Sequence, residues 1–211
     1  MRKDSKSHKK IGIMGGTFNP IHHGHLVTAQ EALSQFKLDM VIFIPTGNPP
    51  HKIENEVASA EDRYIMTVIA TSSNSNFFVS RMEIDRRGKS YTIDTVRQLK
   101  KIYGSRSLLY FITGADAILE ILTWKNTDEI VPLCKFIAAT RPGYNLSRIE
   151  DLRKRLFSNA GAADNKIYIM EIPALSISST DIRNRVRHNR PIDYLLPEGV
   201  SNYILKHGLY K

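Results

Sequence analysis

Short apolar segments alternate with longer amphipathic segments along most of this 211-residue chain. Six apolar segments rich in β-branched or aromatic residues predict buried strands, at 11–14, 40–44, 77–80, 108–113, 136–139 and 167–170. Between them, apolar residues recur every three or four positions and predict helices, for example at Leu26, Ala29, Leu33 and Phe36 and over 91–103 and 146–157. This alternation predicts an α/β fold, a doubly wound parallel sheet with helices on both faces.

The two ends of the chain differ from this pattern. Residues 1–10, MRKDSKSHKK, are polar and basic, and they predict a flexible basic leader. Residues 11–211 show neither an internal repeat nor a linker, so we expect a single domain. Its last part, about 180–211, has a helical pattern broken at Pro191 and Pro197, and we expect it to pack as a small C-terminal helical cap.

The composition narrows the classes of partner and location. A formal net charge of +9 and a pI near 9.6 favour anionic partners, whether nucleic acid, acidic lipid or a nucleotide. Apolar stretches such as Met40–Ile44 are far shorter than the roughly 20 residues that a membrane helix needs. Cys134 is the only cysteine, so no internal disulfide can form, and we expect a reducing, cytoplasmic location.

Candidate chemistry appears directly after the first predicted strand, in the run GGTFNPIHHGH at 15–25. Gly15 and Gly16 allow backbone amides to approach a phosphate closely, and the helix that follows directs its positive end to the same anion. His22 and His25 are three residues apart, so we expect them on one face of the first helical turn. Two imidazoles there can bind phosphate oxygens and, when protonated, offset developing negative charge.

Other interpretations of this loop are weaker. Its glycine spacing does not match the dinucleotide-binding fingerprint, and a Walker A reading of Gly88-Lys89-Ser90 has Glu83 at the position of the first glycine. His22, His23 and His25 could ligate zinc, but no nearby carboxylate or cysteine completes a recognisable spacing. A structural loop with incidental histidines is the remaining alternative, and phosphate binding explains the pattern better.

A second candidate segment, SSTDIR at 178–183, leads from an extended run into a helix. Hydroxyl residues at a helix start commonly satisfy free backbone amides, which is a purely structural role. Arg183, about one turn in, could reach back to an anion at the helix start.

Together, these two segments resemble the two signatures of the His-x-Gly-His nucleotidylyltransferase superfamily. The resemblance extends over about 10–211 and is closest to the bacterial nicotinate-mononucleotide adenylyltransferases. Many members have Asp where this chain has Asn19, a departure that leaves the phosphate loop intact. The resemblance implies a Rossmann-like fold.

The resemblance also implies the site residues that bind ATP. His22, His25 and Arg183 are the implied catalytic residues. The implied ATP-binding residues are Gly15, Gly16, Thr17, Phe18, His22, His25, Gly114, Asp116, Ser178, Ser179, Thr180 and Arg183.

The local sequence pattern alone gives the least support to the acceptor-binding residues. His51 and Lys52 alone indicate an exposed basic loop, whereas the resemblance implies that they lie near the acceptor phosphate. Tyr91 and Thr92 alone indicate an ordinary helix start, whereas the resemblance implies that the amides around them bind the nicotinate carboxylate, for which helix polarity is the physical basis. Trp124 alone suggests a core residue, but the resemblance implies that its ring stacks on nicotinate.

Arg141 follows a late predicted strand. The resemblance places it on the ATP or ribose side, and we group it with the acceptor-binding residues.

The implied reaction transfers the adenylyl group of ATP to nicotinate mononucleotide. It gives deamido-NAD (nicotinate adenine dinucleotide) and pyrophosphate, in NAD biosynthesis. Because the acceptor phosphate is already ionised near neutral pH, no general base is required. We expect Mg²⁺ to enter with ATP, held by phosphates and water, and no metal site built by protein side chains.

Three alternatives stay open. Within the superfamily, the acceptor could be nicotinamide mononucleotide or phosphopantetheine, although phosphopantetheine enzymes usually have Thr-x-Gly-His where this chain has His22 to His25. A non-catalytic nucleic-acid-binding domain would interleave basic residues with exposed aromatics on one face. The basic residues here are scattered, so we expect neither nucleic acid nor a membrane as partner. The number of subunits stays open, a homo-oligomer included.

Overall fold

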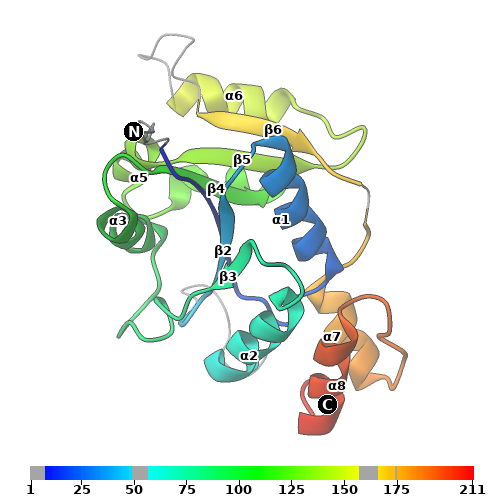
Figure 1. Cartoon of the computed structure of the whole chain (residues 1–211). Helices are drawn as coiled ribbons and strands as arrows, with labels where there is room; N and C mark the ends of the chain where they lie inside the picture. The colour runs from blue at the N-terminus through cyan, green and yellow to red at the C-terminus, as the bar shows by residue number, and fades with distance from the viewer. Residues whose placement is uncertain (1–7, 49–56, 157–165, 174) are drawn as a thin grey trace, which may run out of the picture.

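The computed structural model describes residues 8–48, 57–156, 166–173 and 175–211. Its centre is one parallel sheet of six strands in the order β3-β2-β1-β4-β5-β6 (Figure 1). The strands are β1 (Lys10–Gly16), β2 (Met40–Pro45), β3 (Phe77–Val79), β4 (Leu108–Gly114), β5 (Lys135–Thr140) and β6 (Ile167–Glu171). All six predicted strands are present, and the predicted doubly wound sheet is confirmed.

Each central strand alternates its side chains between two apolar layers. On one face, Met14, Val41 and Ile112 pack with α1 (His23–Gln35), α2 (Ala60–Thr71), α7 (Ser179–Arg187) and α8 (Glu198–His207). On the other face, Ile13, Ile42 and Phe111 pack with α3 (Thr92–Tyr103), α5 (Thr127–Leu133) and α6 (Ser147–Leu156). A strand buried on both faces needs the continuous apolar runs from which it was predicted.

Three short elements between β4 and β5 were not predicted. They are α4 (Ala115–Ile118), a 3₁₀ turn η2 (Ile121–Thr123) and α5, which contains Pro132. None of them is long enough to show two full periods of apolar positions, which is the signal that marked the longer helices.

The described residues change one predicted boundary at the N-terminal end and show two helices in the predicted C-terminal cap. β1 begins at Lys10, inside the predicted leader, because Lys10 pairs with Leu108 and its amide donates to Asp39 Oδ2 at 2.7 Å. The predicted cap contains α7 and α8, and α8 packs against α2 (Figure 1). The division into leader and single domain stays a prediction. Among the described residues, no helix is long and apolar enough to cross a membrane.

Candidate active site

The strand order reverses between β1 and β4, the two central strands of the sheet: β2 and β3 are added on one side of β1, and β4, β5 and β6 on the other. The chain leaves β1 for the layer of α1, whereas it leaves β4 for the layer that contains Ile118 of α4. Helices diverging from neighbouring strands leave a crevice at the carboxyl ends of those strands. Two pockets lie there, and both are lined by Gly15 at the end of β1 and Thr113 at the end of β4.

The first pocket, of about 500 Å³, contains the two signature histidines, and we call it the histidine pocket. Besides His22 and His25, its polar lining includes Asp116, Arg141 and Tyr144. The Tyr144 hydroxyl donates to Asp116 Oδ1 at 3.0 Å. The apolar lining, which includes Ile112, Leu175 and Ile177, gives this pocket a surface against which a flat base can pack.

The two histidines are arranged by the start of α1. His22 is the extended N-cap residue, and its backbone amide donates to His25 Nδ1 at 3.2 Å. The two rings lie 3.8 Å apart between centroids, and the edge of Phe18 supports His25 at 5.1 Å. A side chain at Gly24 would approach the His22 ring to 3.0 Å, which explains the glycine between the histidines. The signature thus fixes both rings against one another.

Both imidazoles are neutral in this structure near pH 7. Burial, and secondarily the neighbouring His23, lowers the pKa of His22 to about 4. Burial, and secondarily His22, lowers the pKa of His25 well below its usual value. Nδ1 of His22 is buried without a hydrogen-bond partner among the described residues. The histidines therefore present neutral ring nitrogens to the histidine pocket, and the protonated form considered from the sequence would require their pKa values to rise.

The second pocket, of about 620 Å³, contains Trp124, and we call it the tryptophan pocket. Trp124 packs edge-on to Phe111 at 5.4 Å, which holds the indole at the pocket wall. Tyr91 is the N-cap of α3 and makes no side-chain capping bond, so its side chain does not pair with the amides of the first helical turn. Lys125 Nζ lies 4.2 Å from the centre of the Tyr91 ring. This end of α3 therefore combines helix polarity with a nearby cation.

One carboxyl group is buried in the tryptophan pocket. Glu83 is 7% exposed, and its Oε1 accepts a hydrogen bond from Thr95 Oγ1 at 2.6 Å. Burial raises the pKa of Glu83, while the Thr95 bond and the nearby Arg86 oppose this shift. From the sequence, Glu83 stood out only as a mismatch to a Walker A loop.

The second signature lies against the first. Ser178 caps α7 by accepting from the Asp181 amide at 3.1 Å, and Ser179 Oγ donates to the Pro20 carbonyl at 2.8 Å. Arg183 Nη1 donates to the Asn19 carbonyl at 2.9 Å. These bonds join segments more than 150 positions apart in the chain. The N-terminus of α7 is therefore fixed beside the GGTFNPIHHGH loop.

A buried cation holds that loop from the side of α2. Arg63 is 1% exposed and donates to the carbonyls of Thr17, Ala58 and Gly47 at 2.8, 3.0 and 3.2 Å. Burial lowers the pKa of Arg63. Nothing in the local pattern around Arg63 distinguishes it from a surface arginine of α2, so the sequence analysis missed it.

The structure distributes the predicted site residues unevenly. Gly15, His22, His25, Gly114 and Asp116 line the histidine pocket, whereas Gly15, Gly16, Thr17, Tyr91, Thr92 and Trp124 line the tryptophan pocket. Phe18 is only 2% exposed. Arg141, grouped with the acceptor residues from the sequence, lines the histidine pocket instead, because β5 ends beside β4 on that side. His51 and Lys52 lie outside the described residues.

Residues missed from the sequence lie in both pockets. Lys125 follows Trp124 directly, so this neighbour was the available signal. Tyr144 follows Arg141 by one turn and had no motif of its own. Within the described part of the chain, no group of three or more His, Cys, Asp or Glu side chains is placed to hold a metal ion.

Two adjoining pockets at the switch point of a parallel sheet, with a glycine-rich loop between them, define a nucleotide-binding α/β protein. Residues 13–185 match the family described as cytidylyltransferase-like. A protein of Thermoanaerobacter sp. (strain X514), named "Probable nicotinate-nucleotide adenylyltransferase", is 57% identical over 202 residues, which cover 96% of this chain and 94% of the relative. A protein of Moorella thermoacetica with the same name is also 57% identical, covering 96% and 92%.

A solved structure shares the fold. It is the Plasmodium falciparum nicotinic acid mononucleotide adenylyltransferase complexed with NaAD, with a TM-score of 0.77 and 22% identity, covering 96% of this chain and 98% of that one. The chain therefore belongs to the cytidylyltransferase-like family and, within it, to the nicotinate-nucleotide adenylyltransferases.

Proposed function

We propose that this enzyme transfers the adenylyl group of ATP to nicotinate mononucleotide, giving nicotinate adenine dinucleotide and pyrophosphate in NAD biosynthesis. The observation that carries the proposal is the pair of pockets that meet at Gly15 and Thr113. Two nucleotides bound in adjoining pockets can bring their phosphates together at this shared boundary. The names of the relatives support the same activity.

The histidine pocket is our proposed ATP site. His22 and His25 would hold the triphosphate through neutral ring nitrogens, and the backbone of Gly15 and Gly16 would contribute amide donors. Arg141 and Asp116 would contact the nucleoside part, which moves Arg141 from the acceptor to ATP. Arg183 and Thr180 line neither of the two pockets. From α7, which is fixed beside the GGTFNPIHHGH loop, Arg183 would reach the leaving phosphates. Ser178 and Ser179 would act by fixing α7 against the loop, since their hydroxyls already bond backbone groups.

The tryptophan pocket is our proposed acceptor site. Trp124 would stack on the nicotinate ring. The free start of α3 at Tyr91 and Thr92, with Lys125 above the Tyr91 ring, would bind the nicotinate carboxylate. Glu83 would accept a hydrogen bond from a ribose hydroxyl, since it is a buried acceptor in the same pocket.

The chemistry that follows is an in-line displacement. An oxygen of the acceptor phosphate forms a bond to the α-phosphorus of ATP, while the bond to the bridging oxygen breaks and pyrophosphate leaves. The acceptor phosphate is already ionised, so catalysis rests on position and on stabilising charge. We propose that the substrate is MgATP and that the reaction takes place in the cytoplasm.

The test is pyrophosphate release from MgATP, with nicotinate mononucleotide and nicotinamide mononucleotide assayed in parallel. We expect turnover that strongly prefers the acid. Comparable rates would contradict the proposed carboxylate site, and no turnover with either would contradict the acceptor assignment.

A histidine variant tests the ATP site. We expect His25→Ala to lower kcat by at least about a hundredfold, because removing one positioned donor has such effects in other enzymes. His188→Ala, at an exposed histidine after α7, is the control and should stay within twofold of wild type. Unchanged turnover of His25→Ala would remove His25 from the proposed machinery.

A further inference from the structure

The segment after α8 returns to the first signature. Gly208 ends the helix at φ 61°, and the Leu209 amide donates to the Ile204 carbonyl at 3.0 Å. Tyr210 then adopts φ 65°, the left-handed conformation that a residue other than glycine rarely takes. Its hydroxyl donates to Asn19 Oδ1 at 2.8 Å, across 191 positions of sequence. The uncommon backbone conformation of Tyr210 thus accompanies a specific hydrogen bond to the GGTFNPIHHGH loop at 15–25, which we call the signature loop.

Asn19 connects three parts of the molecule. It is 2% exposed, and its Oδ1 also accepts from the Ala58 amide, just before α2, at 3.0 Å. Its backbone carbonyl accepts from Arg183 Nη1 at 2.9 Å. Because two donors converge on the side-chain oxygen and a third on the backbone oxygen, the orientation of Asn19 is set jointly by Tyr210, α2 and Arg183.

The surroundings of Tyr210 keep its hydroxyl a donor. Burial raises the pKa of Tyr210 above its usual value, while the guanidinium groups of Arg183 and Arg63 oppose this shift and Asp62 adds to it. The hydroxyl therefore stays protonated at physiological pH. It lies close to both arginines that contact the signature loop.

We infer that Tyr210 is a positioning residue of the ATP site. Its hydroxyl fixes the side chain of Asn19, and the backbone carbonyl of Asn19 in turn holds the guanidinium of Arg183, which the proposed function assigns to the phosphates of ATP. Tyr210 itself touches no substrate in this arrangement. The inference rests on the proposed function only in assigning Arg183 to ATP.

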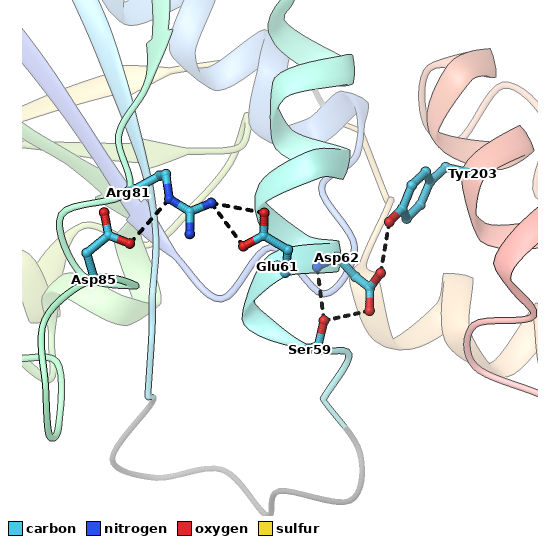
Figure 2. Close-up of polar contacts among 6 residues, drawn as sticks. All are labelled: Ser59, Glu61, Asp62, Arg81, Asp85 and Tyr203. Atoms are coloured by element: carbon cyan, nitrogen blue, oxygen red, sulfur yellow. Dashed lines mark hydrogen bonds and ion pairs between the residues drawn. The ribbon is translucent and has the colours of Figure 1, made fainter.

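A purely structural role for the Tyr210 bond is the competing explanation, and Tyr203 provides the matched control. Tyr203, on α8, donates its hydroxyl to Asp62 Oδ1 of α2 at 2.9 Å (Figure 2). Asp62 also accepts from Ser59 Oγ at 2.6 Å, so this bond belongs to the capped start of α2. Tyr203→Phe and Tyr210→Phe each remove one tyrosine hydroxyl between the cap and the rest of the molecule, but only Tyr210→Phe affects the signature loop.

The experiment compares both variants with wild type in the pyrophosphate assay and in thermal unfolding. We expect Tyr210→Phe to lower kcat/KM for ATP roughly tenfold while the KM for the acceptor stays within twofold. Tyr203→Phe should keep kcat/KM for ATP and the KM for the acceptor within twofold of wild type. Its loss of thermal stability should be similar to that of Tyr210→Phe. Tyr210→Phe kinetics within twofold of wild type, or activity loss in both variants in proportion to their stability, would overturn the inference.

Two further arms separate this inference from the proposed function and from misfolding. Binding of a non-hydrolysable α,β-methylene analogue of ATP, measured by calorimetry, needs no acceptor, and we expect Tyr210→Phe to weaken it several-fold. If wild type failed to use nicotinate mononucleotide, this measurement would still decide the role of Tyr210. Asn19→Asp keeps an oxygen acceptor, so Tyr210→Phe should reduce binding in that background too. In Asn19→Ala, adding Tyr210→Phe should change nothing further, and an additive loss there would count against the inference.

Discussion

At the scale of single residues, we expect the site to distinguish its substrates by the placement of polar groups more than by charge. His22 and His25 are neutral near pH 7. The tryptophan pocket is lined by two lysines, Lys89 and Lys125, and Lys125 lies over the ring of Tyr91. An exposed ammonium group contributes modestly to binding because water screens it. The backbone amides at the start of α3 are fixed in place, so they can contribute without reordering. We therefore expect carboxylate recognition to be shared between α3 and Lys125.

Substitution of Lys125 measures its share. Lys125→Met should reduce the preference for nicotinate over nicotinamide mononucleotide about fivefold, which corresponds to the roughly 1 kcal/mol expected for a screened charge pair. The measurement is kcat/KM for both acceptors. Lys101→Met, in the last turn of α3 and away from the pocket, is the control. A preference unchanged by Lys125→Met would show that Lys125 takes no part in acid recognition.

At the scale of elements, α2 anchors the loop through a buried cation. Arg63 donates hydrogen bonds to three backbone carbonyls. They belong to Thr17 after β1, Gly47 after β2 and Ala58 before α2. A buried charge is costly unless its donors are all paired, and a carbonyl left without its donor is costly as well. Arg63 therefore holds the ends of three segments in one position.

Removing that cation should mainly destabilise the protein. We expect Arg63→Met to lower the free energy of unfolding by about 3 kcal/mol, because it leaves buried carbonyls unpaired. Denaturant unfolding checks the value. Arg81→Met is the matched control: Arg81 bonds Glu61 and Asp85 at the surface (Figure 2), where such pairs contribute about 1 kcal/mol or less. Equal losses in both variants would show that the burial of Arg63 does not matter.

The elements also show what the sequence pattern could predict. The strands follow from continuous apolar runs, and the signature residues of β1 and α1 follow from a motif contiguous in the chain. The placement of Arg141 depends on which strands are neighbours, which periodicity does not report. The bond from Tyr210 to Asn19 joins positions 191 residues apart, and neither residue carries a local pattern that indicates the other. Local signals thus predict elements and motifs, whereas contacts between distant segments require the fold.

At the scale of the whole molecule, the buried histidines link stability to pH. The pKa of His22 is about 4 in the folded chain, against 6.5 for an unperturbed histidine, and that of His25 is also lowered. Between these pH values the unfolded chain binds more protons than the folded chain. Acid therefore favours unfolding, and the free energy of unfolding rises with pH across this window. The contribution of His22 to the free energy of unfolding is fully present above pH 6.5, the pKa of histidine in the unfolded chain, and is lost as the pH falls toward about 4.

A histidine variant isolates this contribution from the titration of carboxyl groups. We expect the free energy of unfolding to fall between pH 7 and pH 4.5, and His22→Gln to remove part of that fall, up to about 3 kcal/mol for a shift of this size. His188→Gln, at an exposed position, should follow wild type. The comparison uses the slope of unfolding free energy against pH, so a constant loss of stability in either variant cancels. Parallel slopes for wild type and His22→Gln would show that His22 titrates alike in both states. A buried neutral imidazole would then no longer describe His22 in the histidine pocket.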